Sequence, residues 1–462
     1  MPVNSFDDYP MTWRPSLRRT GEEPIYREIA GQLEADIRSG LLGPGDKLPP
    51  QRELADYLDV NLSTVARAFK LCAEKGLICG ETGRGTYIAA GVGSDLPMLD
   101  ETGLDRCVNL GASHPLYEQN AYVVETLRRL LKKANVSAVL EYGETAGRLS
   151  HRRSGQRWLE WMGLEMPPER ILLTAGLQNS LAVAMTALLR SGDKLAVSTL
   201  TYPGVKKLAG LLGIQLLPVP CREGGLDLGV LDQLCRNEGV RGLYVSPDHH
   251  NPTAVTMDSG QRAALAELIQ RRELLCLEDG TYSFLSPAPL PPLAALAPEQ
   301  CIYLSTVSNA LSAGLRIAFV GMPPRYAQAL SSGGDALNVM APPLEAEVVS
   351  QLIDSGLARQ MVEEKRRELH WRNQLTERYL GDFSLLGESD AQFRWLGLPS
   401  GWSGRSFEEA ARARGVQVFG WERFAVGGGR VAPGVRLAIS SPRSRQELER
   451  GLGLLRNLLE EA

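Results

Sequence analysis

Lysine is scarce in this chain of 462 residues. Nine of its 50 basic residues are lysines, which leaves 41 arginines, and no lysine stands between Lys207 and Lys365. Arginine keeps its charge and binds anions with a planar fork of donors, whereas lysine offers a primary amine that can act as a nucleophile. Along that interval the sequence therefore excludes chemistry that needs a side-chain amine.

Signatures of disulfides, metals and membranes are also missing. The seven cysteines form no CxxC pair, and the five histidines form no HExxH motif. The longest strongly apolar run, residues 208–220, is shorter than the ~20 residues that cross a bilayer. Residues 1–15 contain acidic side chains and no apolar core of a signal peptide. We expect reduced thiols, no bound metal, no membrane segment and a cytoplasmic location.

The composition is that of an ordinary folded chain. Hydrophobic residues make up 44%, charged residues make up 23%, and a net charge of −4 gives no basic footprint over the whole chain. The length predicts about three domains. A small, glycine-containing stretch after residue 89 is typical of a linker. The predicted division is a domain over residues 1–90, a linker over 91–105 and a larger region over 106–462, of which about 345–462 forms a small C-terminal part.

The first 90 residues predict three short helices and a hairpin. Apolar residues recur at helical spacing along 26–37, and Pro49-Pro50 opens a second helix at little cost. A third helix runs roughly from Ser63 to Lys75 after a tight turn. A glycine-containing turn then joins two apolar segments near residues 77–88. Two short helices around a tight turn, followed by a hairpin, predict a winged helix-turn-helix.

This segment resembles the GntR-type winged helix along its whole length, from IYREIAGQLEADIRSGLLGPGDKLPPQRELADYLDVNLSTVARAF to TGRGTYI. The resemblance implies a double-stranded DNA operator as partner. Phosphate contacts would position the domain, and base edges would give specificity. We expect Gln51 and Arg52 to meet phosphate and Arg84 to contact DNA from the hairpin tip. The residues expected at the major groove are Asn61, Ser63, Thr64 and Arg67. Leu62 departs from the pattern, because many relatives carry arginine there.

After residue 106, apolar strand-like runs alternate with amphipathic helices, which predicts an α/β fold with a mainly parallel sheet. Polar motifs follow these strands in a fixed order. They are Thr174-Ala-Gly-Leu-Gln178, Thr201-Tyr-Pro-Gly204, Asn251-Pro-Thr253, Glu278-Asp-Gly-Thr-Tyr282, Ser305-Thr-Val-Ser-Asn309, Leu311-Ser-Ala-Gly-Leu-Arg316 and Val435-Arg436-Leu437. In open α/β sheets ligands bind beyond the carboxyl ends of the strands, and a helix N-terminus binds phosphate.

The ordered motifs resemble fold-type I aminotransferases, and their fusion to a GntR-type winged helix resembles the MocR subfamily of bacterial regulators. The resemblance implies a homodimer and a pocket for pyridoxal 5′-phosphate (PLP). Tyr202 would stack on the pyridine ring, and Asp279 would pair with its protonated nitrogen.

The remaining roles come from the same resemblance. Asn251 and Tyr282 would bond the ring hydroxyl, and Arg436 would grip a ligand carboxylate. Tyr142 would reach the phosphate held by the partner subunit. The residues that would hold the phosphate are Gly176, Leu177, Gln178, Thr306, Ser308 and Arg316.

The lysine that this chemistry requires is absent. In the family it precedes the phosphate-binding arginine by seven residues and forms a Schiff base with the PLP aldehyde. Here that position is Asn309, and the lysine-free interval offers no substitute by a shift of register. Ser198, Leu200, Gly280 and Ala254 also depart from the family pattern. We therefore expect PLP or a PLP derivative to bind noncovalently, if it binds at all, and no transaminase activity.

Three functions remain open. The first is a DNA-binding transcriptional regulator whose aminotransferase-like domain dimerises and senses an amino acid or a vitamin B6 compound, including PLP, its amine form (PMP) or a preformed PLP–amino-acid adduct. The second is a PLP-dependent aminotransferase, which the fold supports and Asn309 opposes. The third is a dimerisation scaffold without a small ligand. Retained charged residues such as Asp279 and Arg436 favour the first, because unpaired buried charge is costly.

Overall fold

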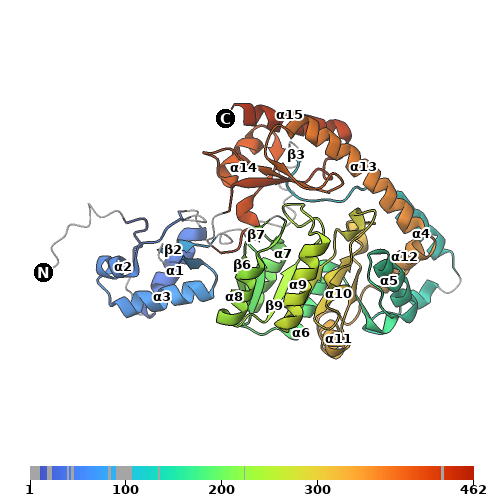
Figure 1. The fold of residues 1–462 in the computed structure, drawn as a ribbon, viewed down its shortest axis with the longest axis horizontal. Coiled ribbons are helices and arrows are strands. Elements are labelled where there is room, and N and C mark those ends of the chain that lie inside the picture. The colour runs from blue at the N-terminus through green and yellow to red at the C-terminus, as the bar shows by residue number, and fades with distance from the viewer. Residues whose placement is uncertain are drawn as a thin grey trace.

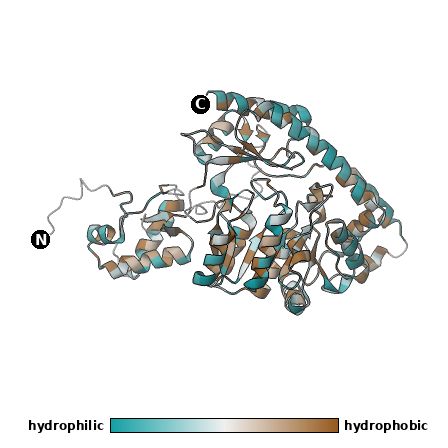
Figure 2. Cartoon of the chain, viewed as in Figure 1, coloured by the Kyte–Doolittle hydropathy of each residue, from teal (hydrophilic) through white to brown (hydrophobic). Residues whose placement is uncertain are grey.

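The computed structural model describes residues 11–17, 23–38, 41–42, 46–81, 85–89, 107–133, 136–222, 224–427 and 431–461. Figure 1 shows a small, mostly helical N-terminal domain beside a larger body, in which a small C-terminal part covers one end of a central sheet. In Figure 2 hydrophilic colour follows the outer turns of the long C-terminal helices. No helix within these ranges is long and apolar enough to cross a membrane.

The N-terminal domain has the predicted three helices and hairpin. Its elements are α1 (Ile25–Arg38), α2 (Gln51–Leu58), α3 (Leu62–Glu74), β1 (Ile78–Glu81) and β2 (Gly85–Ile88). Pro50 precedes α2, and the side chain of Asn61 caps α3 by accepting a hydrogen bond from the Ser63 amide at 2.9 Å. Asp59 adopts a left-handed conformation, φ 50°, where α2 ends and the chain turns toward α3.

Seven strands form the central sheet in the order β4-β12-β11-β10-β9-β5-β6. β12 runs antiparallel to both neighbours, and the other adjacent pairs are parallel. The strands are β4 (Ile171–Thr174), β5 (Lys194–Ser198), β6 (Gln215–Val219), β9 (Gly242–Val245), β10 (Leu275–Asp279), β11 (Cys301–Thr306) and β12 (Ala318–Gly321). The parallel strands therefore end at the same edge, where the predicted site residues follow them.

Helices cover both faces of this sheet, because alternate side chains of each strand point to opposite faces. Ile302 and Leu304 pack with one set of helices, and Cys301 and Tyr303 pack with the other. The first set is α6 (Leu177–Leu188), α7 (Pro203–Leu212) and α11 (Pro324–Asn338). The second set is α4 (Asn120–Leu131), α5 (Leu149–Trp161), α8 (Leu228–Glu238), α9 (Ser259–Arg271), α10 (Leu293–Leu296) and α12 (Pro343–Asp354).

The small C-terminal part is built around a four-stranded sheet in the order β13-β14-β17-β16. Its strands are β13 (Leu385–Leu386), β14 (Arg394–Gly397), β15 (Val416–Gln417), β16 (Phe419–Gly420) and β17 (Gly434–Leu437), with β15 outside the main sheet. Its helices are α13 (Leu357–Leu380), α14 (Gly404–Ala413) and α15 (Arg445–Glu460). β3 (Val108–Asn109), at the start of the larger region, pairs with β15 and completes this core. α12, which begins near residue 345, instead packs in the core of the large part with α4 and α5.

Candidate functional site

A cavity of about 1500 Å³ opens at the carboxyl ends of the central strands, under the small C-terminal part. The cavity extends past Lys206 toward α1 and α3 of the N-terminal domain, and its volume includes this extension. Most of the predicted cofactor residues line it: Leu177, Gln178, Tyr202, Asn251, Asp279, Tyr282, Thr306, Ser308, Arg316 and Arg436. Asn309 lines the same cavity. Segments far apart in the sequence thus meet at the edge predicted from the strand ends.

An anion cradle lies at the N-terminus of α6. Gly176 caps this helix with φ 84°, a conformation that favours glycine. A Cβ on Gly176 would lie only 2.6 Å from Nη2 of Arg316, so the missing side chain lets the guanidinium approach the helix end. Nη1 of Arg316 donates to the Ser308 hydroxyl at 3.2 Å. Free helix N–H groups, a hydroxyl and a guanidinium together suit a phosphate group.

The carboxylate of Asp279 is buried at the centre of the site. Its Oδ2 accepts a hydrogen bond from the Tyr244 hydroxyl at 2.6 Å, and its Oδ1 accepts one from the Thr281 amide at 3.0 Å. Burial raises the pKa of Asp279, and the hydrogen bonds from Thr281 and Tyr244 oppose that shift. In the described structure no cation pairs with this carboxylate. It can therefore accept a charged N–H donor such as a pyridinium.

Tyr202 stands at the wall of the cavity, at the start of α7. Its hydroxyl donates to Oε1 of Gln178 at 3.3 Å, and Nε2 of Gln178 donates to the Gly204 carbonyl at 3.0 Å. Burial and the nearby Asp279 carboxylate raise the pKa of Tyr202, so the ring stays neutral. Gln178 thus holds the ring by its side chain, which is a role the sequence did not predict for it.

Arg436 is buried on the small-domain side of the cavity. Its Nη1 donates to Oδ1 of Asn251 at 2.8 Å, and its Nη2 donates to the Gly111 carbonyl at 2.7 Å. Its Nε is buried and has no hydrogen-bond partner among the described residues. Three aromatic rings surround the guanidinium, with Phe424 nearest at 4.9 Å. Burial lowers the pKa of Arg436 to about 10, so it remains a cation, and no carboxylate among the described residues pairs with it.

Asn309 occupies the position that the resemblance assigns to the Schiff-base lysine. Its Oδ1 accepts a hydrogen bond from Nε2 of Gln392 at 3.3 Å. Nζ of Lys365, on α13, donates to the Asn309 carbonyl at 3.2 Å and to the Leu311 carbonyl at 3.1 Å. Lys365 and Gln392 are both buried, and neither was predicted from the sequence. A buried lysine therefore reaches the backbone of Asn309, but it does not replace its side chain.

Lys365 should make stability depend on pH. Burial lowers the pKa of its amine from 10.5 to about 7, and the Glu118 carboxylate opposes the shift. Between these values the unfolded chain binds a proton that the folded chain lacks, so stability rises with pH, by about 1.4 kcal/mol per pH unit. Below pH 7 the cost of burying the charge is fully present. Burial lowers the pKa of Lys206 to about 7 as well, so it contributes to the same rise. We expect urea denaturation from pH 7 to 9.5 to show a smaller rise of stability with pH in Lys365→Met than in the native chain.

The matched control is Lys132→Met, because Lys132 is exposed on the same chain. Its denaturation midpoint should follow the native pH dependence. If the free energy of unfolding changed equally with pH in the native protein and in Lys365→Met, the buried Lys365 amine would be charged throughout this pH range.

The structure gives local contacts or backbone geometry for three of the four departures from the family pattern. A Cβ at Gly280 would lie 2.3 Å from the Tyr303 ring, so an aspartate cannot stand there without moving that tyrosine. Ala254 has φ 56°, a conformation that favours glycine. The Ser198 hydroxyl lies 2.8 Å from the Cys221 sulfur. Nothing in the structure explains Leu200.

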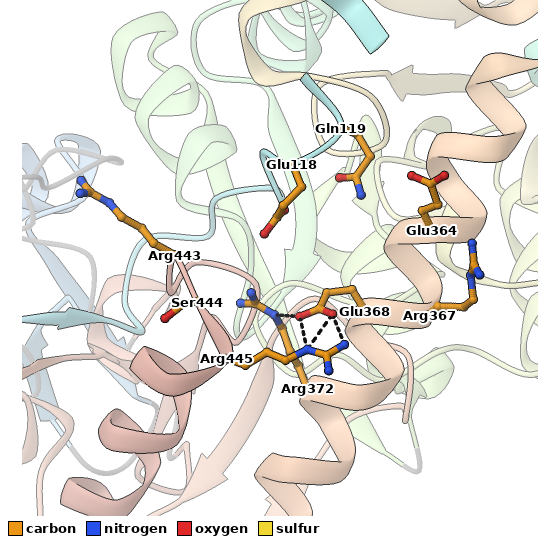
Figure 3. Close-up of a pocket in the computed structure, with 9 residues that line it drawn as sticks. All are labelled: Glu118, Gln119, Glu364, Arg367, Glu368, Arg372, Arg443, Ser444 and Arg445. Atoms are coloured by element: carbon orange, nitrogen blue, oxygen red, sulfur yellow. Dashed lines mark hydrogen bonds and ion pairs between the residues drawn. The ribbon is translucent and has the colours of Figure 1, made fainter. Parts of the chain in front are cut away.

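A second hollow, of about 540 Å³, lies between α13 and the start of α15 and contains none of the predicted site residues (Figure 3). Glu368 lies between two of its arginines: Oε1 pairs with Nε of Arg372 at 2.9 Å, and Oε2 pairs with Nη2 of Arg445 at 2.6 Å. The pair with Arg372 lies within α13, whereas the pair with Arg445 joins α13 to α15. The hollow therefore lies in a charged contact of the small C-terminal part, apart from the cavity at the strand ends.

The predicted DNA-contacting residues occupy the start of α2 and the first turns of α3. Arg52, Asn61, Ser63 and Arg67 are exposed, whereas Gln51 and Thr64 are half-buried. Asn61 uses its side chain to cap α3, and the Arg67 guanidinium lies 4.3 Å above the Tyr26 ring. Arg84 lies outside the described residues. DNA contact by all seven positions stays a prediction.

Tyr142 does not line the cavity of its own chain, and its side chain is 86% exposed.

Sequence reasoning missed several residues of the site: Tyr244, the phenylalanines around Arg436, Lys365 and Gln392. The one signal that could have identified Tyr244 is its hydroxyl, which is a polar group within the apolar run before Asn251. Lys365 lies in the charged run Glu363-Glu-Lys-Arg-Arg367, which gives no sign that one member is buried.

Comparison with known proteins agrees with the two-part architecture. Residues 25–88 match the gntR family of bacterial regulatory proteins, and residues 105–454 match the aminotransferase class I and II family. The chain is 38% identical over 461 residues to the uncharacterized HTH-type transcriptional regulator YdeF of Bacillus subtilis (strain 168), with all of both chains covered.

Two further similarities concern a regulator and an enzyme. The probable rhizopine catabolism regulatory protein MocR of Rhizobium meliloti is 26% identical over 81% of this chain and 82% of its own. The crystal structure of LysN, an alpha-aminoadipate aminotransferase from Thermus thermophilus, matches with a TM-score of 0.71 and 25% identity, over 79% of this chain and 95% of that chain. That crystal contains N-(5′-phosphopyridoxyl)-L-leucine.

The chain belongs to the aminotransferase class I and II family and joins this fold to a GntR-type helix-turn-helix domain. Its larger region has the fold-type I aminotransferase fold, as the sequence predicted. The chain is homologous to MocR-like regulators, which confirms the predicted relationship at that level.

Proposed function

We propose that the protein is a dimeric DNA-binding transcriptional regulator of the cytoplasm, whose aminotransferase-like domain binds PLP or a PLP derivative noncovalently and performs no transamination. The observation that carries this proposal is a cavity that keeps its charged anchors around Asn309. When bound, PLP supplies an aldehyde and an electron-withdrawing pyridine ring. The chain's own residues bind and orient this ligand.

Three features of the cavity fit PLP. The α6 N-terminus, Ser308 and Arg316 suit its phosphate, and the buried Asp279 carboxylate suits its ring nitrogen. Nε of Arg436 has no hydrogen-bond partner among the described residues, and aromatic rings surround the guanidinium. This group suits the carboxylate of an amino acid that is attached to the pyridine ring or lies beside it. Asn309 has an amide that cannot form a Schiff base. The cavity can therefore still bind and orient PLP, but it cannot attach PLP covalently through residue 309.

DNA binding and dimerisation complete the proposal. The GntR-type domain places the exposed Arg52 and Arg67 on α2 and α3, where they would reach phosphates and base edges. The exposed Tyr142 would be covered by the partner subunit. Ligand binding would act on DNA only through a difference in affinity for two arrangements of the dimer.

Ligand binding should raise the melting temperature of the native protein. A ligand at 100 times its dissociation constant stabilises the folded state by about 2.7 kcal/mol. We expect PLP to give a saturable shift that Arg316→Met abolishes, because this variant removes the phosphate clamp. After borohydride treatment and dialysis the native protein should release the cofactor. No shift with PLP, PMP or amino acids would favour a scaffold without a ligand, and stable reduction onto the protein would contradict noncovalent binding.

The second candidate is a PLP-dependent aminotransferase. The match to LysN over most of both chains and the retained Asp279 and Arg436 favour it. Measured turnover of an amino acid by the PLP-loaded native protein would establish this function in place of the first.

A further inference from the structure

The orientation of the Asn309 amide is fixed by its neighbours. Nε2 of Gln392 donates at 3.2 Å to the backbone carbonyl of His114, which can only accept. The same Nε2 lies 3.3 Å from the Asn309 amide, so the atom that faces it must be the acceptor Oδ1. Asn309 therefore directs its donor, Nδ2, away from Gln392.

Nδ2 of Asn309 is an uncommitted donor. No hydrogen-bond partner for it exists within the described ranges, and Asn309 lines the cavity. The backbone of Asn309 is held in place, because Nζ of Lys365 donates to the carbonyls of Asn309 and Leu311. The backbone carbonyl and the side-chain Oδ1 of Asn309 are thus both held by hydrogen bonds, which leaves Nδ2 as the donor that this lining residue can offer to a ligand.

The anchors of the pyridine ring decide which ligand atom meets this donor. Under the proposed function the ring nitrogen lies at Asp279, the phosphate arm at Ser308 and Arg316, and the ring hydroxyl at Asn251. The C4 substituent is opposite the nitrogen and between the phosphate arm and the hydroxyl. It therefore lies on the side away from Asp279, where Asn309 follows Ser308 in the chain.

The ligand forms differ at this substituent in their hydrogen-bonding character. The aldehyde of PLP offers an acceptor oxygen, whereas the ammonium of PMP offers only donors. A donor that faces a donor leaves both groups unsatisfied. The Arg436 cation, which is bonded to Asn251, adds repulsion toward a ligand ammonium.

We propose that Asn309 is a specificity-determining residue, which donates from Nδ2 to an oxygen on the C4 substituent and selects the aldehyde form of the vitamin B6 phosphate over the amine form. This inference rests on the proposed function, because it assumes that the cavity binds such a ligand. It assigns a recognition role to the residue that replaced the nucleophile.

The test compares the affinities of three ligands by calorimetry on the full-length protein. PLP presents an acceptor at C4, PMP presents a cation, and 4′-deoxypyridoxine 5′-phosphate presents a methyl group that sets the baseline. We expect the native protein to bind PLP roughly ten-fold more tightly than PMP, the effect of about one hydrogen bond. Displacement of bound PLP by the methyl analogue should be complete, which separates cavity binding from reaction with surface lysines.

Asn309→Asp should reverse the preference. The carboxylate has the size of the amide but replaces the donor Nδ2 with an acceptor, so PMP should bind more tightly than PLP. Asn237→Asp on α8 is the control, because it adds the same charge at an exposed position. An unchanged PLP-to-PMP ratio in Asn309→Asp, or a native preference for PMP, would overturn the inference while the proposed function stands. Binding of none of the three compounds would overturn both.

Discussion

Asn309→Lys should convert reversible PLP binding into covalent attachment. The variant places a primary amine seven residues before Arg316, in a cavity lined by Ser308, Arg316, Asp279 and Tyr202. We expect a new absorbance band in the visible range when PLP is added, and borohydride should then fix one cofactor per chain at position 309, as peptide mass spectrometry would show. The native protein should show neither. The expected effect is all-or-none, because an amide cannot form the bond.

Asn309→Gln is the matched control, since it lengthens the side chain without supplying an amine. A labelled native protein or glutamine variant would point to another lysine, and peptide mapping would identify it. Failure of Asn309→Lys to react, together with retained PLP binding, would show that position 309 does not face the reactive carbon. That result would contradict the register derived from Ser308 and Arg316.

Arg67→Ala should weaken operator binding roughly ten- to hundred-fold, the cost of removing one arginine that reads a base edge. Arg67 is exposed on α3, and its guanidinium stacks on Tyr26, which restricts the side chain before DNA arrives. Gel-shift titrations against the DNA that flanks the gene would measure the loss. Because the contact is to a base, discrimination between operator and unrelated DNA should fall as well.

Arg27→Ala separates DNA contact from support of the fold. Arg27 lies 6.0 Å from the same Tyr26 ring and is also exposed, but it belongs to α1. This variant should keep near-native affinity. Arg52→Ala should instead weaken binding to all sequences equally and reduce the salt slope by about one unit, as expected for a phosphate contact. Equal losses for Arg27→Ala and Arg67→Ala would mean that the tyrosine stack, not base contact, supports binding.

The sequence predicted the parts of the site that follow strands. Thr174, Asp279 and Thr306 each end a buried apolar run, and parallel strands that begin at one edge must end together at the other. The same logic placed Asn251 and Tyr202 in loops at that edge. These positions depend on short stretches of chain, so their local pattern was sufficient.

Other parts of the site depend on contacts that no local pattern records. Lys365 reaches Asn309 across 56 residues, and Gln392 does so across 83 residues. Lys365 stands among charged neighbours on α13, where a helical pattern alone does not distinguish a buried lysine from an exposed one. The orientation of the Asn309 amide could not be predicted from the sequence either. It follows from the backbone carbonyl of His114, which lies in a different segment and fixes the Gln392 side chain. The antiparallel strand β12 was also not anticipated.

The pairing of β3 with β15 determines where the DNA-binding domain is tethered. Val108 and Asn109 are among the first described residues after the linker, and their partners are Val416 and Gln417 in the small C-terminal part. β3, which follows the linker in the chain, is thus fastened to the part that covers the cavity and not to the sheet beneath it. Any rotation of that cover moves the tether point as a rigid body, so mechanical coupling to the DNA-binding domain does not need to cross the central sheet.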